Sequence, residues 1–245
     1  MTKGLVIIPT FNEKENIAKI VAAVFTQPTP FHVLVVDDNS PDGTAEIVKK
    51  QQENYSGRLH LLERQGKQGL GTAYLAGFKW GLEKGYEYLY EMDADFSHNP
   101  ADLNRMQTEL ESDQCDLVVG SRYVQGGKVM NWPWDRIILS YGASLYVRLI
   151  TWMPVKDPTA GFIGYHRKVL ESIALDSIRF VGYAFQIEMK YSAYQRKFRI
   201  KEIPITFVDR VEGTSKLSTG IVHEAVFGVL SMRWKHLIGS IPLPS

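Results

Sequence analysis

Two aspartates one residue apart, Asp93 and Asp95, end the stretch EYLYEMDAD and are well suited to metal chemistry. Residues two apart on a strand point to the same side, so these carboxylates can converge where the strand opens into a loop. Because two nearby negative charges repel, the pair requires a proton or a cation. Mg²⁺ or Mn²⁺ suits such oxygen ligands when phosphate oxygens complete its shell. The alternative is an Asx turn that merely ends the strand.

A second acidic pair, Asp37 and Asp38 in VVDDNSPDG, follows another apolar run. A carboxylate at a strand end can accept hydrogen bonds from a nucleobase or ribose. The stretch is also strongly turn-forming, and both roles can hold at once. The chain contains neither G-x-G-x-x-G nor G-x-x-x-x-G-K-[ST], so neither a dinucleotide fold nor a P-loop is indicated. The Gly-rich stretch 67–74 is explained by entry into a helix.

Short apolar runs lead into these acidic segments, as expected for strands that are covered on both faces. They lie at 5–8, 32–37, 58–63, 87–92 and 116–120. Helical spacing separates them; the first helix carries Ile17, Ile20, Val21 and Val24, with Thr10 or Asn12 as its cap and Glu13 or Glu15 completing a capping box. This alternation predicts an α/β fold with a mostly parallel central sheet and helices on both faces. The loops PTFNE, DDNSPDG and DADFSH should gather at its carboxyl edge, where such sheets bind ligands.

Beyond residue 120 the pattern is looser. We predict a loop over GGKVMNWPWDR, a strand and then a helix over 157–170, and one strand over 198–210. Two segments, near 136–153 and 221–238, are amphipathic. With no linker, repeat or low-complexity tract, the sequence predicts one domain over residues 1–245.

Composition narrows the class of protein. The chain has 245 residues, of which 44% are hydrophobic and 22% charged, an ordinary soluble globular profile. A net charge of +1 gives no reason to expect a nucleic acid partner. The single cysteine, Cys115, excludes a disulfide framework and a cysteine zinc site and suits a reducing compartment.

Five motifs occur in the order PTFNE, VVDDNSPDGT, KQGLGTAY, MDADFSH and GSRYVQGG. Together they resemble the inverting family 2 glycosyltransferases, which have a nucleotide-sugar-binding fold of the GT-A type. Four further stretches extend the resemblance to the dolichol-phosphate (polyprenol-phosphate) mannose synthases: GSRYVQGGKVMNWPWDR, DPTAGF, GYAFQIEM and IPITFVDRVEGTSKLS. The resemblance covers nearly the whole chain.

The resemblance implies a GDP-mannose donor, a polyprenyl (dolichyl) monophosphate acceptor and Mg²⁺ or Mn²⁺ as cofactor. It implies a nucleotide pocket made by Pro9, Phe11, Glu13, Val36, Asp38, Ala94 and Asp95. Asp93 and Asp95 would hold the metal, with Ser97 where some relatives have a glutamine as a further ligand. The acceptor phosphate would meet Arg122, Arg136 and Ser140, and a basic segment containing Arg210 and Lys216 would close over the donor diphosphate. Asp95, Arg122, Arg210 and Lys216 are thus the residues expected to act in catalysis.

Such a reaction needs no general base. A phosphate monoester is already anionic near neutral pH, since its second pKa is about 6, so it can attack C1 of the sugar directly. One in-line displacement then inverts the anomeric centre and gives a β-linked product. Glu188 is open to three roles, as a base, as a donor or sugar ligand, or as an ion partner of Lys190. His98 lacks a second histidine at ligand spacing, which favours a turn or supporting role over zinc binding.

The expected acceptor is a membrane lipid, yet the sequence shows neither a signal peptide nor a run of eighteen apolar residues. Segments 136–153 and 221–238 have apolar faces edged by tryptophan and basic residues, which fits helices lying in the bilayer interface. Covering the sheet is an equally good explanation for each. We therefore expect a peripheral protein on the cytoplasmic side of a membrane, attached through these segments or through a membrane-anchoring partner protein.

Three other functions stay open. A UDP-sugar donor such as UDP-glucose is one, because base choice cannot be derived from these loops. A sugar-phosphate nucleotidyltransferase would also use paired aspartates, but it usually carries a Gly-rich basic loop after the first strand, which PTFNEKENI does not match. A non-catalytic nucleotide or membrane adaptor is disfavoured by the intact acid pair and by the intact DRVEGTSK segment.

Overall fold

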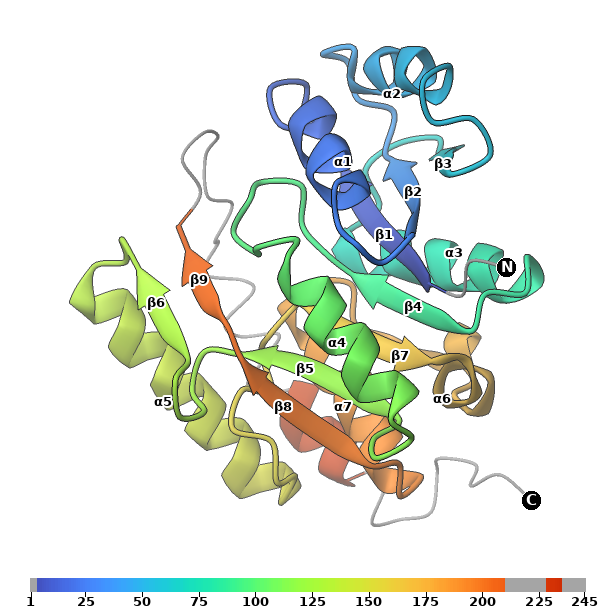
Figure 1. Ribbon diagram of the computed structural model, residues 1–245. Coiled ribbons are helices and arrows are strands. Elements are labelled where there is room, and N and C mark those ends of the chain that lie inside the picture. The colour runs from blue at the N-terminus through green and yellow to red at the C-terminus, as the bar shows by residue number, and fades with distance from the viewer. Residues whose placement is uncertain (1–3, 210–227, 235–245) are drawn as a thin grey trace.

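A seven-stranded sheet forms the centre of the protein. The structure, a computed structural model, describes residues 4–209 and 228–234 (Figure 1). The sheet has the order β3-β2-β1-β4-β7-β5-β8. Its strands are β1 (Gly4–Thr10), β2 (His32–Asp37), β3 (Leu59–Glu63), β4 (Tyr88–Glu91), β5 (Leu117–Ser121), β7 (Ile163–His166) and β8 (Ile200–Pro204). Strand β7 runs antiparallel to β4 and β5, and the other pairings are parallel, which confirms the mostly parallel sheet.

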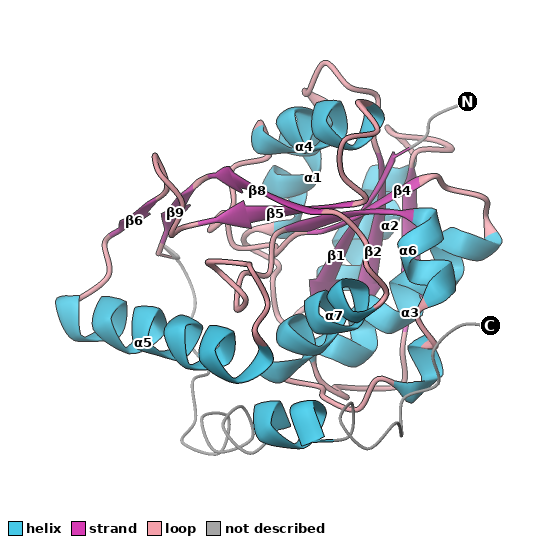
Figure 2. Ribbon diagram, turned by 90° about the horizontal axis from the view of Figure 1, so that it is seen from below, coloured by secondary structure: helices cyan, strands magenta, loops and turns pink. Residues whose placement is uncertain are grey.

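Helices cover both faces of this sheet and make three layers (Figure 2). One face carries α1 (Ile17–Phe25), α2 (Thr44–Gln52) and α4 (Asp102–Glu111), and the other carries α3 (Leu70–Glu83), α6 (Arg167–Ser172) and α7 (Tyr183–Gln195). Strand β1 shows why, because successive side chains of a strand point to opposite faces. Val6 and Ile8 pack into one core while Leu5 and Ile7 pack into the other, and all four are fully buried.

The strand order creates a switch point. The chain runs outward from β1 through β2 to β3 and then returns to β4 on the other side of β1. Strands β1, β2, β4 and β5 all point the same way, so the loops that follow them meet at one edge. In open α/β sheets, ligands bind in the crevice outside such an edge.

The second half of the chain builds the same sheet and adds a smaller one. Strand β6 (Lys128–Met130) pairs with β9 (Thr206–Val208), and α5 (Trp134–Thr151) follows β6. We predicted a loop where β6 lies and one strand where β8 and β9 lie. Ile205 separates β8 from β9. Its N–H donates to the Ser121 carbonyl, and its carbonyl accepts the N–H of Lys128. That residue links the two sheets.

The predicted capping box of the first helix is wrong. Helix α1 begins at Ile17 with Asn16 as its N-cap, and no side chain caps it. The Thr10 hydroxyl instead donates to Asp37 Oδ1 at 2.7 Å. Asn12 takes a left-handed φ of 61°, and its N–H donates to Ser40 Oγ. These residues stay outside the helix because they fasten the loop after β1 to the loop after β2.

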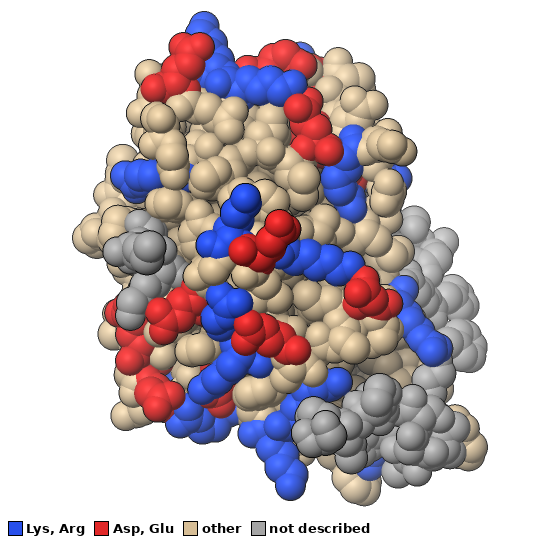
Figure 3. All heavy atoms as spheres, turned by 90° about the vertical axis from the view of Figure 1, so that its right-hand side faces the viewer, with Lys and Arg blue, Asp and Glu red and all other residues tan. Residues whose placement is uncertain are grey.

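Charges of both signs are interspersed on the face seen in Figure 3, where lysine and arginine lie beside aspartate and glutamate. Exposed side chains of opposite charge form ion pairs in the described part of the chain, for example Arg167–Glu171 and Lys49–Glu63. Exposed pairs of this kind contribute little to stability, about 0–1 kcal/mol each. The face in Figure 3 carries no extended patch of one sign.

Candidate active site

The two aspartates after β2 have different surroundings. Asp37 is fully buried, and its carboxylate accepts hydrogen bonds from the Thr10 hydroxyl and from the N–H and hydroxyl of Ser40. It therefore holds the turn. Asp38 forms a two-pronged ion pair with Arg64, with Nε–Oδ1 at 2.6 Å and Nη2–Oδ2 at 2.8 Å. Arg64 also donates to the Thr72 hydroxyl at 2.9 Å, which ties the loop after β3 to α3.

The residues expected around the nucleoside lie on neighbouring strand ends. Pro9 and Val36 are in register on β1 and β2, and Phe11 and Glu13 follow in the loop after β1. The Glu13 N–H donates to Thr44 Oγ1 at 3.0 Å, which fixes that loop. The side chain of Val36 is fully buried in the sheet core, so at this position the backbone is what faces the edge.

Asp93 and Asp95 lie in the loop after β4. The Tyr74 hydroxyl donates to Asp93 Oδ1 at 3.3 Å. Asp95 Oδ1 accepts the N–H of Ser97 at 3.0 Å, and Phe96 between them has a left-handed φ of 60°. The Asx turn considered from the sequence is thus present. Its hydrogen bond uses Oδ1 of Asp95, so the turn and a metal site are compatible.

The donor set of this loop fits a divalent cation held partly by substrate. Among the described residues, no group of three or more histidine, cysteine, aspartate or glutamate side chains is placed to hold a metal ion. A cation here would therefore take its protein ligands from the two carboxylates, with other oxygens completing its shell. Mg²⁺ and Mn²⁺ are bound in this way, by one or two carboxylates together with substrate phosphates. Ser97 is almost fully buried, and its hydroxyl is the only further oxygen we predicted as a ligand.

A buried polar layer lies beside the acidic loop. Glu91, at the end of β4, accepts hydrogen bonds from Tyr165 and Gln186. Burial raises its pKa to about 7. The ammonium group of Lys190, fully buried on α7, donates to the carbonyls of Ala160 and Gln186, and burial lowers its pKa to about 8. The sequence offered no sign of this layer, because Gln186 and Lys190 are far from Glu91 along the chain.

His98, in the acidic loop, contacts the Phe207 ring, which also lies beside Arg122 after β5. Its ring stacks on Phe162 with centroids 4.8 Å apart and meets Phe207 edge-on at 5.5 Å. Its charge would interact with both Asp95 and Arg122. Burial lowers its pKa to about 4, so the ring is neutral near pH 7. This supporting position agrees with the role favoured from the sequence.

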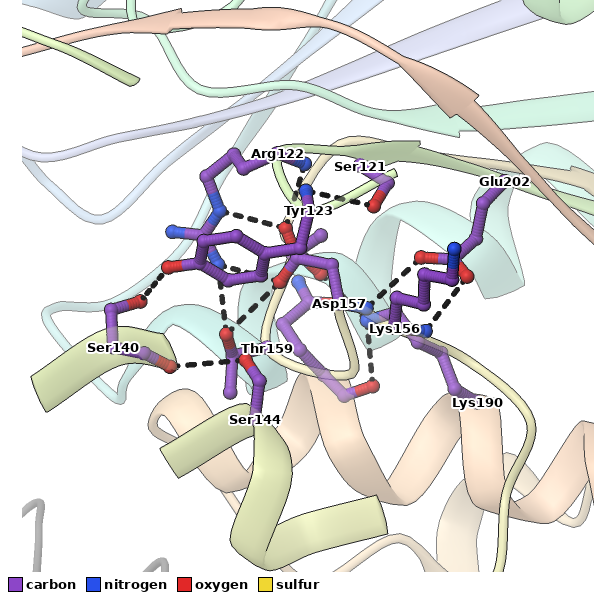
Figure 4. A network of polar contacts seen from close by, with 12 residues as sticks. Ser121, Arg122, Tyr123, Ser140, Ser144, Lys156, Asp157, Thr159, Lys190 and Glu202 are labelled. Atoms are coloured by element: carbon purple, nitrogen blue, oxygen red, sulfur yellow. Dashed lines mark hydrogen bonds and ion pairs between the residues drawn. The ribbon is translucent and has the colours of Figure 1, made fainter. Parts of the chain in front are cut away.

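Arg122 follows β5 and contacts Asp157 and Thr159 (Figure 4). It is almost enclosed, with 9% of its side chain exposed. Its Nε and Nη2 donate to the Asp157 carboxylate at 2.8 and 2.7 Å, and Nη2 also donates to Thr159 Oγ1 at 2.8 Å. The rings of Trp132 and Phe207 lie 5.5 and 5.6 Å from the guanidinium carbon. Arg122 is therefore not a solvated surface charge at the end of a strand.

The other two residues expected at the acceptor phosphate lie on α5, close to Arg122. The Arg136 guanidinium stacks 4.1 Å from the centre of the Trp132 ring, which also faces Arg122, and pairs with Asp209 at 3.0 Å. Ser140 Oγ accepts a hydrogen bond from the Tyr123 hydroxyl at 2.7 Å. The structure thus brings all three residues into one cluster. Arg210 and Lys216 lie outside the described residues.

The observed hydrogen bonds of Glu188 belong to none of the three roles that we considered for it. Its Oε2 accepts the N–H groups of Arg179 and Phe180 at 3.0 and 3.1 Å. Burial raises its pKa. The carboxylate therefore anchors the loop that precedes α7.

An apolar surface extends along α5. Its outer face exposes Trp134, Ile138, Leu139, Tyr141, Leu145 and Leu149, while Ser144, Val147 and Thr151 face inward. The buried hydroxyls of Ser144 and Thr151 donate to the carbonyls four residues back, so the buried polar groups are satisfied within the helix. Large apolar side chains thus point outward while small polar ones point inward.

Residues 228–234 are helical and lie beside α5 (Figure 2). Val229 and Met232 are buried with Val147 of α5 and Ile187 of α7. A groove of about 590 Å³ is lined by Leu149, Ile150, Trp152, Leu230, Ser231, Arg233 and Trp234. Helix α5 and residues 228–234 thus each cover the core with one side and expose apolar groups on the other. Their placement in a bilayer interface stays a prediction. No helix within the described part of the chain has the length and apolar character needed to cross a membrane.

The fold and the acidic strand edge define an α/β enzyme of the GT-A type, and sequence relatives make it a glycosyltransferase. The chain belongs to glycosyl transferase family 2, whose sequence model matches residues 5–174. It is 47% identical over 227 residues to the polyprenol monophosphomannose synthase of Mycolicibacterium smegmatis, covering 93% of this chain and 85% of that protein. It is 45% identical over 238 residues to the undecaprenyl-phosphate mannosyltransferase of Micrococcus luteus, covering 95% and 96%.

Solved structures share the fold. Glucosyl-3-phosphoglycerate synthase from Mycobacterium tuberculosis, in complex with Mn²⁺, UDP and glucosyl-3-phosphoglycerate, has a TM-score of 0.69 at 14% identity, covering 100% of this chain and 81% of that one. A mannosyltransferase from Pyrobaculum calidifontis, in complex with GDP-mannose and Mn²⁺, has a TM-score of 0.60 at 19% identity, covering 99% and 66%. The GT-A fold predicted from the motifs is confirmed, and so is the resemblance to polyprenyl-phosphate mannosyltransferases.

Proposed function

We propose that this enzyme transfers mannose from GDP-mannose to a polyprenyl monophosphate, with inversion, and that it requires Mg²⁺ or Mn²⁺. The carrying observation is the identity of 45–47% to two polyprenyl-phosphate mannose transferases over nearly the whole chain. The geometry supports it, because the Phe207 ring contacts both His98, in the acidic loop suited to a metal-bound diphosphate, and Arg122, in the basic cluster suited to a monophosphate. Two anionic substrates could therefore meet at this edge.

The basic cluster would serve the acceptor. Arg122, Arg136 and Ser140 would bind its phosphate and hold an oxygen in line with C1 of the sugar. The positive charges of Arg122 and Arg136 would offset repulsion between two phosphate-bearing substrates. The acceptor is already anionic near neutral pH, so no side chain has to remove a proton. This agrees with the contacts of Glu188, whose carboxylate accepts hydrogen bonds from two backbone N–H groups.

The acidic loop would serve the donor. Asp93 and Asp95 would hold the divalent cation, which when bound neutralises negative charge that develops on the leaving diphosphate. The loops after β1 and β2, with Asp38 held by Arg64, would receive the nucleoside. Arg210 and Lys216 are proposed to add positive charge near the same diphosphate. Alignment and charge stabilisation together would supply the rate enhancement.

The outer face of α5 would rest in the membrane interface. Its apolar side chains begin beside Arg136 and Ser140, so a lipid phosphate in the basic cluster would place its chain near them. Trp152 and Trp234 are 72% and 66% exposed, and the Arg233 guanidinium lies 4.6 Å from the Trp152 ring. Tryptophan and arginine are typical of the boundary between headgroups and acyl chains. We propose direct peripheral attachment, with a membrane-anchoring partner protein as the alternative.

The decisive experiment incubates the purified enzyme with Mn²⁺ or Mg²⁺, undecaprenyl phosphate in detergent, and radiolabelled GDP-mannose or UDP-glucose. We expect butanol-extractable label only from GDP-mannose and only with metal. Label from UDP-glucose alone would overturn the donor assignment and keep the lipid acceptor; the UDP complexes of similarly folded enzymes make that arm necessary. No lipid-linked product from either donor would refute the proposed function.

A further inference from the structure

A chain of buried contacts begins at Arg122 and leads to Asp157. Asp157 lies in the loop between α5 and β7 and is fully buried. Its Oδ2 accepts the backbone N–H and Nε of Arg122 at 2.9 and 2.8 Å, and its Oδ1 accepts Nη2 at 2.7 Å. The same oxygen accepts the Thr159 hydroxyl at 3.2 Å, while Thr159 Oγ1 in turn accepts Nη2 of Arg122. Backbone and side chain of one arginine are thus held by one carboxylate.

The loop that carries Asp157 is itself fastened (Figure 4). The Glu202 carboxylate, on β8, accepts the N–H groups of Lys156 and Asp157 at 2.7 and 2.9 Å. At the other end of the loop, the Lys190 ammonium donates to the Ala160 carbonyl at 2.6 Å. The position of the Asp157 carboxylate is therefore set by β8 and α7.

These contacts determine which way the guanidinium of Arg122 faces. Three donors of a rigid, planar group are bound to fixed partners, so its plane cannot rotate without breaking charge-assisted hydrogen bonds. Burial alone would raise the pKa of Asp157, but the hydrogen bonds and charge of Arg122, together with the charge of Lys190, outweigh burial and hold the pKa below its usual value. The carboxylate is thus charged near neutral pH and keeps its hold on the arginine.

We infer that Asp157 is a positioning residue for the acceptor phosphate: without touching substrate, it orients Arg122, and Glu202 in turn holds the loop that carries it. This inference rests on the proposed function of the basic cluster. It predicts that loss of Asp157 damages use of the acceptor selectively. A residue that only stabilises the fold would instead lower the amount of active protein without changing one Michaelis constant more than the other.

The chain offers a matched control at the opposite end of the same strand. Asp116 directly precedes β5, as Arg122 directly follows it, and it is also buried. Its carboxylate accepts the backbone N–H, Nε and Nη2 of Arg199 at 2.8, 3.0 and 2.8 Å. The two pairs share one geometry, but only Arg122 belongs to the proposed acceptor cluster.

The experiment compares Asp157→Asn with Asp116→Asn. For Asp157→Asn we expect the acceptor KM to rise roughly 10- to 100-fold, the range for losing a hydrogen bond to a charged group, while the donor KM stays within about twofold. For Asp116→Asn we expect a lower Tm and both KM values within about twofold of the parent. Thr159→Val keeps the carboxylate and should raise the acceptor KM roughly three- to tenfold. It provides a second measurement if Asp157→Asn does not fold.

A double-mutant cycle separates action through Arg122 from an independent effect. In an Arg122→Ala background, Asp157→Asn should change the acceptor KM less than about twofold. Fold-changes that multiply, or an equal rise in both KM values, would overturn the inference. Calorimetric binding of farnesyl phosphate to the same proteins gives a readout that does not need turnover. If the parent binds farnesyl phosphate but makes no lipid-linked product, the proposed function fails while this cycle still decides the role of Asp157; a parent that does neither refutes both.

Discussion

The Tyr123 hydroxyl donates a hydrogen bond to Ser140 Oγ at 2.7 Å, and this contact joins the end of β5 to the apolar helix α5. Tyr123 is the neighbour of Arg122, whose guanidinium carbon lies 5.1 Å from the centre of its ring. The edge that carries the candidate site and the proposed lipid-facing helix are therefore connected through one tyrosine and one serine.

Tyr123→Phe should weaken this connection. The ring stays beside Arg122, but α5 loses a hydrogen bond, which contributes about 0.5–1.5 kcal/mol. We expect the acceptor KM to rise roughly two- to tenfold with the donor KM unchanged. Tyr141→Phe is the matched control. Tyr141 lies on α5 next to Ser140, and its ring meets that of Tyr123 edge-on at 5.3 Å. Equal effects of the two substitutions would contradict a specific role for the Tyr123 hydroxyl.

Asp95→Ala should abolish transfer. It removes one of two carboxylates proposed to hold the cation and also removes the acceptor of the Ser97 N–H. Asp95→Asn keeps an oxygen for that N–H but lacks the charge, so it separates the turn from the metal site. We expect both variants to lose more than about 100-fold in kcat and to lose nucleotide-dependent Mn²⁺ binding, measured by electron paramagnetic resonance. Near-parental turnover of Asp95→Asn would refute the metal assignment.

Leu149→Glu should weaken membrane attachment without damaging the core, because Leu149 is 64% exposed on the outer face of α5. We expect less protein to sediment with vesicles of phosphatidylglycerol and phosphatidylcholine, while turnover of farnesyl phosphate in detergent stays near the parental value. Lys50→Gln, at an exposed position on α2, changes the net charge by the same amount and should leave sedimentation unchanged. Parental sedimentation of Leu149→Glu would point to attachment through a partner protein.

The parallel part of the sheet could be predicted from the sequence because buried strands carry a strong local signal. The run 32–37 is apolar nearly throughout, and β2 has those same bounds. Pairing partners carry no such signal. The sequence offers no way to see that β9 would leave β8 to pair with β6, or that β7 would enter the sheet antiparallel between β4 and β5.

The candidate site was predictable as a set of loops but not as a set of contacts. Motif order indicated the acidic and basic loops, and strand direction brought them to one edge. The sequence could not show that Asp37 holds a turn whereas Asp38 pairs with Arg64. The sequence also could not predict that Arg122 contacts Asp157, because 35 residues separate them along the chain. Their contact depends on where Glu202 of β8 holds the loop that carries Asp157.

The buried ammonium of Lys190 predicts an unusual response to alkaline pH. Its folded-state pKa of about 8 lies below the usual 10.5, because burial outweighs the attraction of Glu91, Asp157 and Glu202, and Arg122 lowers it further. Between these values the unfolded chain holds more protons than the folded protein. Stability that depends on Lys190 therefore rises with pH in this window. From pH 8 to 9.5 the gain should be about 2 kcal/mol, from about 1.4 kcal/mol for each pH unit.

Lys190→Met should remove this rise, because it leaves nothing at that position to titrate. The measurement is the urea concentration at the midpoint of unfolding at pH 8 and 9.5, with the m-value checked for constancy. Lys19→Met, at an exposed position on α1, removes a lysine from the surface instead of the core; it is the control and should keep the parental rise. If Lys190→Met gains as much stability as the parent over this interval, the ammonium group is not the origin of the effect. Loss of the rise in Lys190→Met alone would show that this lysine releases its proton inside the folded enzyme, beside the loop that carries Asp157.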